Sequence, residues 1–402
     1  MYRLLEGMRV IEASAFVAAP LGGMTLAQLG ADVIRCDPPG GGVDVGRWPL
    51  TAEGRSLYWA GLNKGKRSVC IDPRNPEGRE LLAALVAAPG EDGGIFLTNL
   101  PALGPLAYEA LRERRADVVM LLITGHADGS TAVDYTVNAA VGVPFATGDA
   151  RPDAPVNHVL AAWDIATGLT AATGLLAAER HRRASGEGSQ IRLALSDVAY
   201  AMVGTLGHIG EAQINGSQRA PNGNHIYGAF GRDFASRDGR RFMVVAITDR
   251  QWRSLCEATG AAEQMAEIEA RLGVDLRDEG QRFEVRDLIA SVLERWAARH
   301  DFEQVRAAFD AASVCWGPYQ SFLEMTAEDP RCSTANPLFE EVDQPGIGRY
   351  LMPGSPLQVQ GLVREPVAPA PELGEHTDRV LAEVLGLSDA RIGELRARGV
   401  VA

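Results

Sequence analysis

The sequence predicts an α/β fold in which a large domain holds a parallel β-sheet and a second, smaller domain is α+β. In the first 198 residues, short apolar runs that end in turn residues alternate with longer segments of helical periodicity. That alternation is typical of a parallel sheet, because each crossover between parallel strands carries a helix over one face. A change of composition near residue 215 predicts the second domain.

The elements of the large domain follow from these runs in order. Strands are expected at residues 9–13, 31–37, 68–72, 94–98, 118–124 and 190–195. Helices are expected at residues 20–29, 76–88, 106–115, 165–183 and 199–212. Right-handed crossovers bring the carboxyl ends of such strands to one edge of the sheet, where ligands bind.

The second domain begins after a segment rich in Gly, Asn and Pro at residues 215–224. A hairpin around Asp238-Gly239 is expected within 227–247, because an Asp-Gly pair between apolar runs is a strong turn signal. Helices are expected at 249–259, 280–298 and 302–312, and a helical tail at 378–398. The predicted division is 1–198 for the first part of the large domain, 199–224 for a linker, 225–318 for the small domain and 319–402 for the return.

Charge and cysteine content exclude several classes of protein. A formal net charge of -13 argues against general nucleic-acid binding, which needs clustered Lys and Arg. The start, MYRLLEGMRVIEAS, has no signal-peptide pattern, and no run approaches the roughly 18 apolar residues of a membrane span. We therefore expect a cytoplasmic protein with no membrane contact. The five widely spaced cysteines and the spacing of the histidines predict reduced thiols and no metal site.

One segment, residues 157–197, places Asp164 at the start of a helix rich in small residues. Apolar residues before the helix would remove water from the carboxylate, and the helix N-terminus would keep it ionised. Such a carboxylate can attack a thioester carbonyl. The alternative is structural, since Asp is favoured as an N-cap.

A second segment, GLNKGKRS at residues 61–68, forms a compact cationic turn before a strand. Its glycines are one residue too close for a Walker A motif. The functional interpretation is a clamp for the phosphates of a nucleotide-containing ligand, and the alternative is a solvated cluster of charge.

Other motifs are absent or ambiguous. The first turn lacks the GxGxxG of a dinucleotide site, and the chain has no GxSxG elbow. His126 lies alone in a turn, where histidine is more often structural or exposed than catalytic. Asp134 follows a turn and either caps a helix or orients groups around a site shared with Asp164.

Taken in order, these blocks resemble the family III CoA-transferases, the group that includes formyl-CoA and carnitine-CoA transferases and the α-methylacyl-CoA racemases. The resemblance is carried by GMRVIEAS, LAQLGADVIRCDPPGG, LNKGKRSVCIDPRNPEGRELL, LTNL, RRASGEGSQIRLALSD and PELGEHTDRVL. It implies a Rossmann-like large domain built from both chain ends, an inserted small domain and an interlocked homodimer. It also implies an acyl-CoA substrate and no cofactor beyond the CoA of that substrate.

The resemblance assigns roles to individual residues. The catalytic nucleophile falls on Asp164. The CoA-binding positions are Phe16, Val17, Ala18, Asn63, Lys66, Arg67, Asn99, Leu100, Thr124 and Asp134. Candidates for holding a distal carboxylate of the acyl group are Arg47, Tyr135 and Arg232.

Two departures and one narrower likeness bear on the reaction. Thr98–Pro101 replaces the family's Glu-Asn-Phe-Arg, so one common cationic contact is missing. Val133 stands where racemases carry a histidine, which removes one of their two opposed acid/base groups. The phrases WAGLNKGKRS, NHVLAAWDIATG and QPGIGRYLMPGSPL imply intramolecular CoA transfer between the two carboxyl groups of a branched unsaturated dicarboxylate. Intermolecular CoA transfer, racemisation and CoA binding without catalysis stay open.

Overall fold

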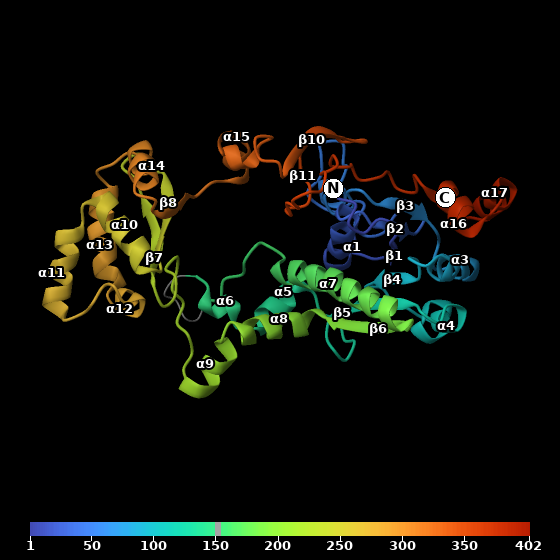
Figure 1. Cartoon of the computed structure of the whole chain (residues 1–402), viewed down its shortest axis with the longest axis horizontal. Helices are drawn as coiled ribbons and strands as arrows, with labels where there is room; N and C mark the ends of the chain where they lie inside the picture. Colours follow the sequence, from blue (N-terminus) through green and yellow to red (C-terminus); the bar gives the residue numbers. More distant parts are fainter. Residues whose placement is uncertain (149–153) are drawn as a thin grey trace. The chain divides into compact units, whose positions relative to one another are not determined.

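The computed structural model describes residues 1–148 and 154–402, which form two compact units (Figure 1). The first unit comprises Met1–Val141, His158–Ile214 and Pro330–Ala402. The second comprises Gly142–Asn157 and Asn215–Asp329. Both ends of the chain thus belong to the first unit. The expected linker is divided between the units at residue 214, and residues 319–329 stay with the second unit.

The first unit is built on a six-stranded parallel sheet of order β3-β2-β1-β4-β5-β6. Its strands are β1 (Arg9–Ala13), β2 (Asp32–Asp37), β3 (Arg67–Cys70), β4 (Ile95–Thr98), β5 (Val119–Thr124) and β6 (Ser189–Ala194). Every neighbouring pair is parallel. The prediction of a parallel α/β sheet is confirmed, and the strand order reverses between β1 and β4, where doubly wound sheets bind their ligands.

Helices cover both faces of this sheet because its strands are apolar on both sides. On one face, Val10 packs in a cluster with residues of α1 (Ala18–Gln28) and α7 (Ala162–Ser185). On the other, Ile11 packs in a cluster with residues of α3 (Pro76–Ala87) and of the C-terminal helices. The remaining helices of this unit are α2 (Leu57–Leu62), α4 (Tyr108–Arg114), α5 (Asp134–Ala140), α8 (Leu195–Thr205), α9 (His208–Asn215), α16 (Thr377–Leu385) and α17 (Asp389–Ala397).

The small residues of α1 and α7 allow these helices to approach closely. A Cβ added to Gly168 of α7 would lie 2.6 Å from the carbonyl oxygen of Ala18. One added to Gly22 of α1 would lie 3.1 Å from the carbonyl oxygen of Gly168. The contact fixes the start of α7, and with it Asp164, against the strands of the sheet.

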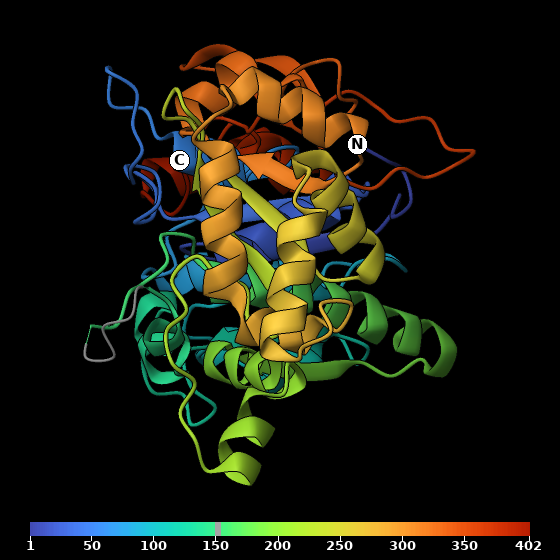
Figure 2. The ribbon, with the colours of Figure 1, turned by 90° about the vertical axis from the view of Figure 1, so that its left-hand side faces the viewer.

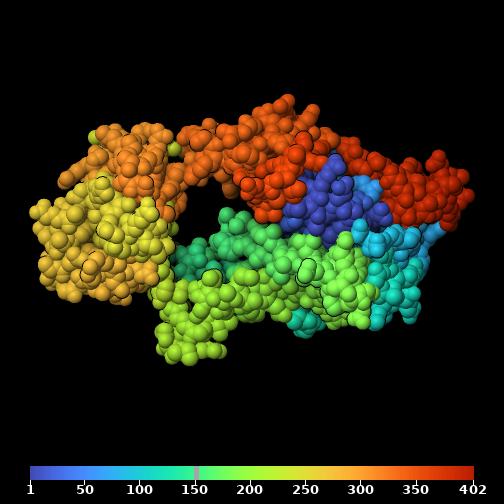
Figure 3. Space-filling view, viewed as in Figure 1, coloured from blue at the N-terminus to red at the C-terminus, as the bar shows by residue number. Residues whose placement is uncertain are grey.

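Segments from the two chain ends lie together within the first unit, as the adjoining blue and red surfaces in Figure 3 show. The hydroxyl of Tyr2 donates to the carbonyl of Leu357, and Ile71 forms a β-bridge with Val401. A two-stranded antiparallel sheet, β10 (Phe339–Gln344) and β11 (Gly348–Pro353), also belongs to this unit.

The second unit contains the three-stranded antiparallel sheet β7-β8-β9 and the helices packed on it, coloured yellow to orange in Figure 2. Its strands are β7 (Phe230–Ala235), β8 (Arg241–Ala246) and β9 (Cys315–Pro318). Its helices are α6 (Val143–Ala146), α10 (Asp249–Thr259), α11 (Ala262–Leu272), α12 (Glu279–Glu284), α13 (Arg286–Ala297), α14 (Phe302–Ala311) and α15 (Phe322–Glu328). The antiparallel pairing of β7 with β8 confirms the predicted hairpin.

Three predicted helices are each two helices in the structure. Segment 199–212 is broken at Gly207, whose φ of 85° no continuous helix adopts. Segment 378–398 is broken after α16, where Gly386 takes the left-handed conformation of a C-cap. Segment 280–298 is broken at Val285, which has non-helical angles. Among the described residues, no helix has the length and apolar character needed to cross a membrane.

Candidate active site

A cavity of about 760 Å³ lies within the first unit, at the carboxyl ends of β1, β4 and β5. This is the edge at which the sequence predicts a ligand site. Its walls come from the loop after β1, the segment before and within α2, the loop after β4, and the starts of α5 and α7. The lining residues with polar or aromatic side chains include Phe16, Arg47, Tyr58, Asn99, Thr124, Asp134, Tyr135 and Asp164.

Asp164 is the third residue of α7 and lines this cavity. The N-cap of α7 is Ala161, so the interpretation of Asp164 as an N-cap is wrong. Its side chain is partly buried, and no other described residue donates a hydrogen bond to its carboxylate. A carboxylate in this position is available to a ligand in the cavity.

The cap of α7 is supplied by Asp134, the first residue of α5, which packs against α7 (Figure 1). Oxygen Oδ2 of Asp134 accepts hydrogen bonds from the backbone N–H groups of Trp163, at 2.7 Å, and Asp164, at 3.1 Å. Asp134 is 1% exposed, and its other oxygen, Oδ1, has no hydrogen-bond partner among the described residues. Asp134 therefore lies against the backbone of Asp164.

Burial and a neighbouring negative charge perturb Asp164. Desolvation is the largest cause, and the charge of Asp134 adds to it, so that the pKa of Asp164 is raised to about 7. The guanidinium of Arg47 acts in the opposite direction. Desolvation and the charge of Asp134 thus outweigh the expected effect of the helix N-terminus, so near neutral pH Asp164 is present in both its ionised and its neutral form. The ionised form is correspondingly basic and poorly solvated, which favours nucleophilic attack.

Arg47 and two aromatic rings form the wall facing this carboxyl group. The guanidinium carbon of Arg47 lies 5.3 Å from the ring centroids of both Phe16 and Tyr58. The Tyr58 hydroxyl is buried and without a partner in the described chain. Desolvation raises the pKa of Tyr58 to about 12, so the hydroxyl stays neutral and can donate a hydrogen bond. Sequence reasoning missed Tyr58, because nothing in SLYWAGL distinguishes it from a packing residue.

Most of the other predicted positions line the same cavity. Val17 is the N-cap of α1 and Ala18 its first residue, and both lie beside Phe16 in the cavity wall. The side chain of Asn99 clamps the backbone of Ala15, accepting from its N–H at 2.9 Å and donating to its carbonyl at 2.7 Å. Further lining positions are Leu100, Thr124 and Tyr135.

Asn63, Lys66 and Arg67 do not line the cavity. The Lys66 ammonium is buried 2.9 Å from the Glu12 carboxylate and 3.0 Å from Oδ1 of Asn63. Arg67 pairs with Asp32 and Glu383. Because Lys66 and Asn63 belong to a buried charge network and Arg67 is held in partly exposed ion pairs, these groups do not form the predicted phosphate clamp at this cavity.

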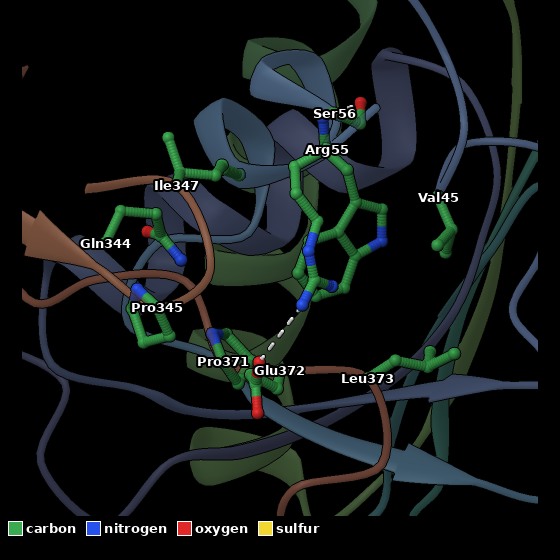
Figure 4. A pocket seen from close by; sticks show the side chains of 11 residues that line it. Val45, Arg55, Ser56, Gln344, Pro345, Ile347, Pro371, Glu372 and Leu373 are labelled. Carbon is green, nitrogen blue, oxygen red and sulfur yellow. Dashed lines mark hydrogen bonds and ion pairs between the residues drawn. The ribbon is translucent and has the colours of Figure 1, made fainter. Parts of the chain in front are cut away.

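Arg232 belongs to the second unit, where it forms an ion pair of 3.1 Å with Glu294. A smaller cavity of about 70 Å³ in the first unit has Arg55 and Glu372 facing each other at 3.7 Å (Figure 4). That volume holds about two water molecules, too little for an acyl-CoA. Among the described residues, no group of three His, Cys, Asp or Glu side chains is arranged to hold a metal ion.

Comparison with known proteins identifies the family. Residues 5–377 match the model of CoA-transferase family III. The chain is 56% identical to 2-methylfumaryl-CoA isomerase of Chloroflexus aurantiacus over 100% of this chain and 98% of that protein. It is 32% identical to succinate–glutarate CoA-transferase of Agrobacterium fabrum, over 94% and 95% of the two chains. A CAIB/BAIF family protein from Brucella suis has the same fold, with a TM-score of 0.78, 24% identity and coverage of 96% and 100%. The chain belongs to CoA-transferase family III.

Proposed function

We propose that this protein is an intramolecular CoA transferase that converts 2-methylfumaryl-CoA into 3-methylfumaryl-CoA. The observation that carries the choice of substrate is the 56% identity, along the whole chain, to a protein of that activity. The partly buried carboxyl group of Asp164, at the wall of a cavity of about 760 Å³, supports a covalent route.

The reaction begins with attack of the Asp164 carboxylate on the C1 thioester carbonyl. The C–S bond breaks, giving a mixed anhydride between Asp164 and C1 and leaving CoA as a thiolate. The thiolate then attacks the aspartyl carbonyl, which produces an Asp164–CoA thioester and releases the dicarboxylate within the cavity. Both carboxylates of the dicarboxylate are then free to react.

The second half repeats these steps at the other end of the molecule. The C4 carboxylate attacks the Asp164 thioester, forming a new anhydride and again a thiolate. Attack of the thiolate on the C4 carbonyl forms 3-methylfumaryl-CoA and regenerates the Asp164 carboxylate. Each step exchanges acyl derivatives of similar reactivity, so atoms and charge balance without ATP, a metal or another cofactor. The protein contributes positioning and the exclusion of water.

Arg47 and Tyr58 are suited to the polar ends of the substrate. Arg47 supplies a positive charge in the cavity wall, and Tyr58 supplies a neutral donor that no other described residue engages. Tyr135 and Arg232 remain predicted contacts of the distal carboxylate. The residues proposed to line the CoA site are Phe16, Val17, Ala18, Asn99, Leu100, Thr124 and Asp134. An interlocked homodimer in the cytoplasm is part of the same proposal.

Replacing Asp164 by Ala tests the covalent route. We expect turnover of 2-methylfumaryl-CoA to fall by roughly four orders of magnitude or more, because removal of a nucleophile disables every step. Circular dichroism should show an unchanged fold, and Asp197→Ala, which removes an exposed carboxylate outside the cavity, should keep wild-type turnover. Mass spectrometry of the wild type with substrate should detect a hydroxylamine-sensitive adduct at Asp164. Substantial isomerisation by Asp164→Ala would contradict the proposal.

The main alternative is intermolecular CoA transfer, the activity named for several relatives that are 26–32% identical. Running the isomerisation in the presence of labelled free mesaconate distinguishes intramolecular from intermolecular CoA transfer. An intramolecular enzyme should give unlabelled 3-methylfumaryl-CoA, whereas label in the product requires an external acceptor. Racemisation is disfavoured because Val133, which lines the cavity, offers no acid/base group. CoA binding without catalysis would give neither product nor adduct.

A further inference from the structure

Asp44 is a buried carboxylate that connects the internal charge network to the cavity wall. It is 2% exposed and lies 3.2 Å from the Arg35 guanidinium. Both of its oxygens accept a hydrogen bond from the backbone N–H of Phe16, each at 2.9 Å. The negative charge of Asp44 is therefore held by Arg35 on one side and directed at Phe16 on the other.

Phe16 needs such a tether because of its backbone conformation. Its φ is 66°, in the left-handed region that residues with a side chain rarely adopt. A residue held there persists only when its surroundings fix it from several directions. Asp44 holds the N–H of Phe16 itself, and Asn99 clamps both backbone groups of Ala15 immediately before it.

Phe16 is 41% exposed, and its conformation places the centroid of its ring 5.3 Å from the guanidinium carbon of Arg47. The backbone N–H of Arg47 in turn donates to the carbonyl of Asp44 at 3.1 Å. Asp44 thus contacts Phe16, whose ring lies beside the Arg47 guanidinium, and also contacts the backbone of Arg47. Loss of the carboxylate would release Phe16, whereas the bond from Arg47 is made to the backbone carbonyl of Asp44 and would stay.

We propose that Asp44 is a positioning residue for the reaction: by fixing Phe16 in its left-handed conformation, it holds the Arg47 guanidinium opposite the Asp164 carboxyl group. This inference rests on the proposed function of Asp164 as nucleophile. It connects the buried network to the site through Asp44, the acid of that network whose side chain accepts from Phe16 among the described residues.

The titration of Asp164 reports the position of Arg47. Among the described residues, the ionisable groups that line the cavity with Asp164 are Asp134 and Tyr135 from α5, Arg47 from the loop before α2, and Tyr58 from α2. Arg47 favours the ionised carboxylate, so moving it away raises the pKa of Asp164. Direct loss of the negative charge of Asp44 would act in the opposite direction and lower that pKa. The sign of the change therefore separates a positioning role from simple electrostatics.

The experiment compares Asp44→Ala, which removes both oxygens that accept from Phe16, with Asp37→Ala in the full-length protein. Asp37 is a matched control, because it is buried and pairs with Arg35 at 2.8 Å but is not bonded to Phe16. Asp164 is titrated by NMR of aspartate labelled at Cγ, with its signal assigned by its loss in Asp164→Asn. In Asp44→Ala we expect Asp164 to titrate at higher pH and kcat to fall on the order of tenfold. In Asp37→Ala, titration should match the wild type.

Two results would overturn the proposal: titration of Asp164 at or below the wild-type pH in folded Asp44→Ala, or an equal upward shift in Asp37→Ala. If Asp44→Ala does not fold, Asp44→Glu replaces it, since it keeps the charge beside Arg35 but displaces the carboxylate from Phe16. An upward shift is again expected there, and its absence counts against the proposal. A wild type that fails to isomerise 2-methylfumaryl-CoA would refute the proposed function, while the titration would still decide the role of Asp44.

Discussion

Two groups of buried polar side chains lie in the same unit, and they differ in whether opposite charges face each other; Oε2 of Glu12, which accepts no hydrogen bond from a described residue, still lies 2.9 Å from the Lys66 ammonium. In the internal network, Lys66 faces Glu12, and Arg35 faces Asp37 and Asp44, all within 3.2 Å. At the cavity, Oδ1 of Asp134 and the hydroxyl of Tyr58 have no partner in the described chain. Burying an unpaired polar group costs free energy. The contrast indicates that the first group stabilises the fold and the second is kept for a ligand.

The largest effect expected from this contrast is on stability. Lys66→Met leaves the Glu12 carboxylate buried without its ammonium partner, and we expect the free energy of unfolding to fall by about 3–5 kcal/mol. Urea denaturation measures this. The KM for acyl-CoA of the folded variant should stay unchanged, because Lys66 does not line the cavity.

Lys64→Met is the matched control for Lys66→Met. Lys64 is also buried, but its ammonium donates to the carbonyl of Pro353 and lies in no ion pair among the described residues. Its loss leaves no charge unpaired, and we expect a decrease of roughly 1 kcal/mol. Equal destabilisation by the two variants would contradict the contrast. A tenfold rise in the KM for acyl-CoA in Lys66→Met would instead support the interpretation of residues 61–68 as a phosphate clamp.

Tyr58→Phe tests the other side of the contrast. If the unpaired hydroxyl serves the substrate, its removal should lower kcat by roughly 10- to 100-fold, because a preorganised donor in a desolvated site is lost. The free energy of unfolding should stay the same or rise slightly, since a buried unpaired hydroxyl is removed. Steady-state kinetics and urea denaturation on the same preparation measure both.

Tyr350→Phe supplies the comparison for that variant. Tyr350 is half-buried on β11, and burial raises its pKa as well, but it does not line the cavity. Wild-type kinetics are expected for it. Should both substitutions leave kcat unchanged, the assignment of unpaired polar atoms to ligand binding would be wrong for Tyr58.

Sequence patterns predicted the sheet and the position of Asp164 well, because both depend on local signals. Apolar runs mark the strands, and the small residues of α7 are read directly as a packing face. The role of Lys66 was not predictable, because Glu12 lies 54 positions away and meets it only across the folded sheet. The same holds for Asp134, whose hydrogen bond from the backbone of Asp164 brings its negative charge beside the nucleophile. The sequence predicts that the Asp134 carboxylate lies near the site, but it does not predict which hydrogen bonds that carboxylate accepts.

The smallest expected effect concerns the pH dependence set by Asp134. Desolvation and the charge of Asp134 together hold the pKa of Asp164 at about 7, well above its ordinary value. Asp134→Asn removes the charge but keeps an oxygen that can accept from the N–H groups of Trp163 and Asp164. The pKa of Asp164 should then fall, so the acidic limb of the kcat profile moves to lower pH, by up to about one unit.

The shift of the acidic limb should differ between a carboxylate at the cavity and one in the internal network. Asp37→Asn removes a buried carboxylate from the internal network, and it should leave the limb in place, because Asp37 pairs with Arg35 and does not act on Asp164. A limb that moves to higher pH in Asp134→Asn would mean that the cap had been lost with the charge. An unmoved limb would mean that burial alone raises the pKa of Asp164. The predicted shift of the limb to lower pH requires that the side chain in Asp134→Asn still caps α7 and that the negative charge is gone. Both follow from the direct contact between the Asp134 side chain and the backbone of Asp164.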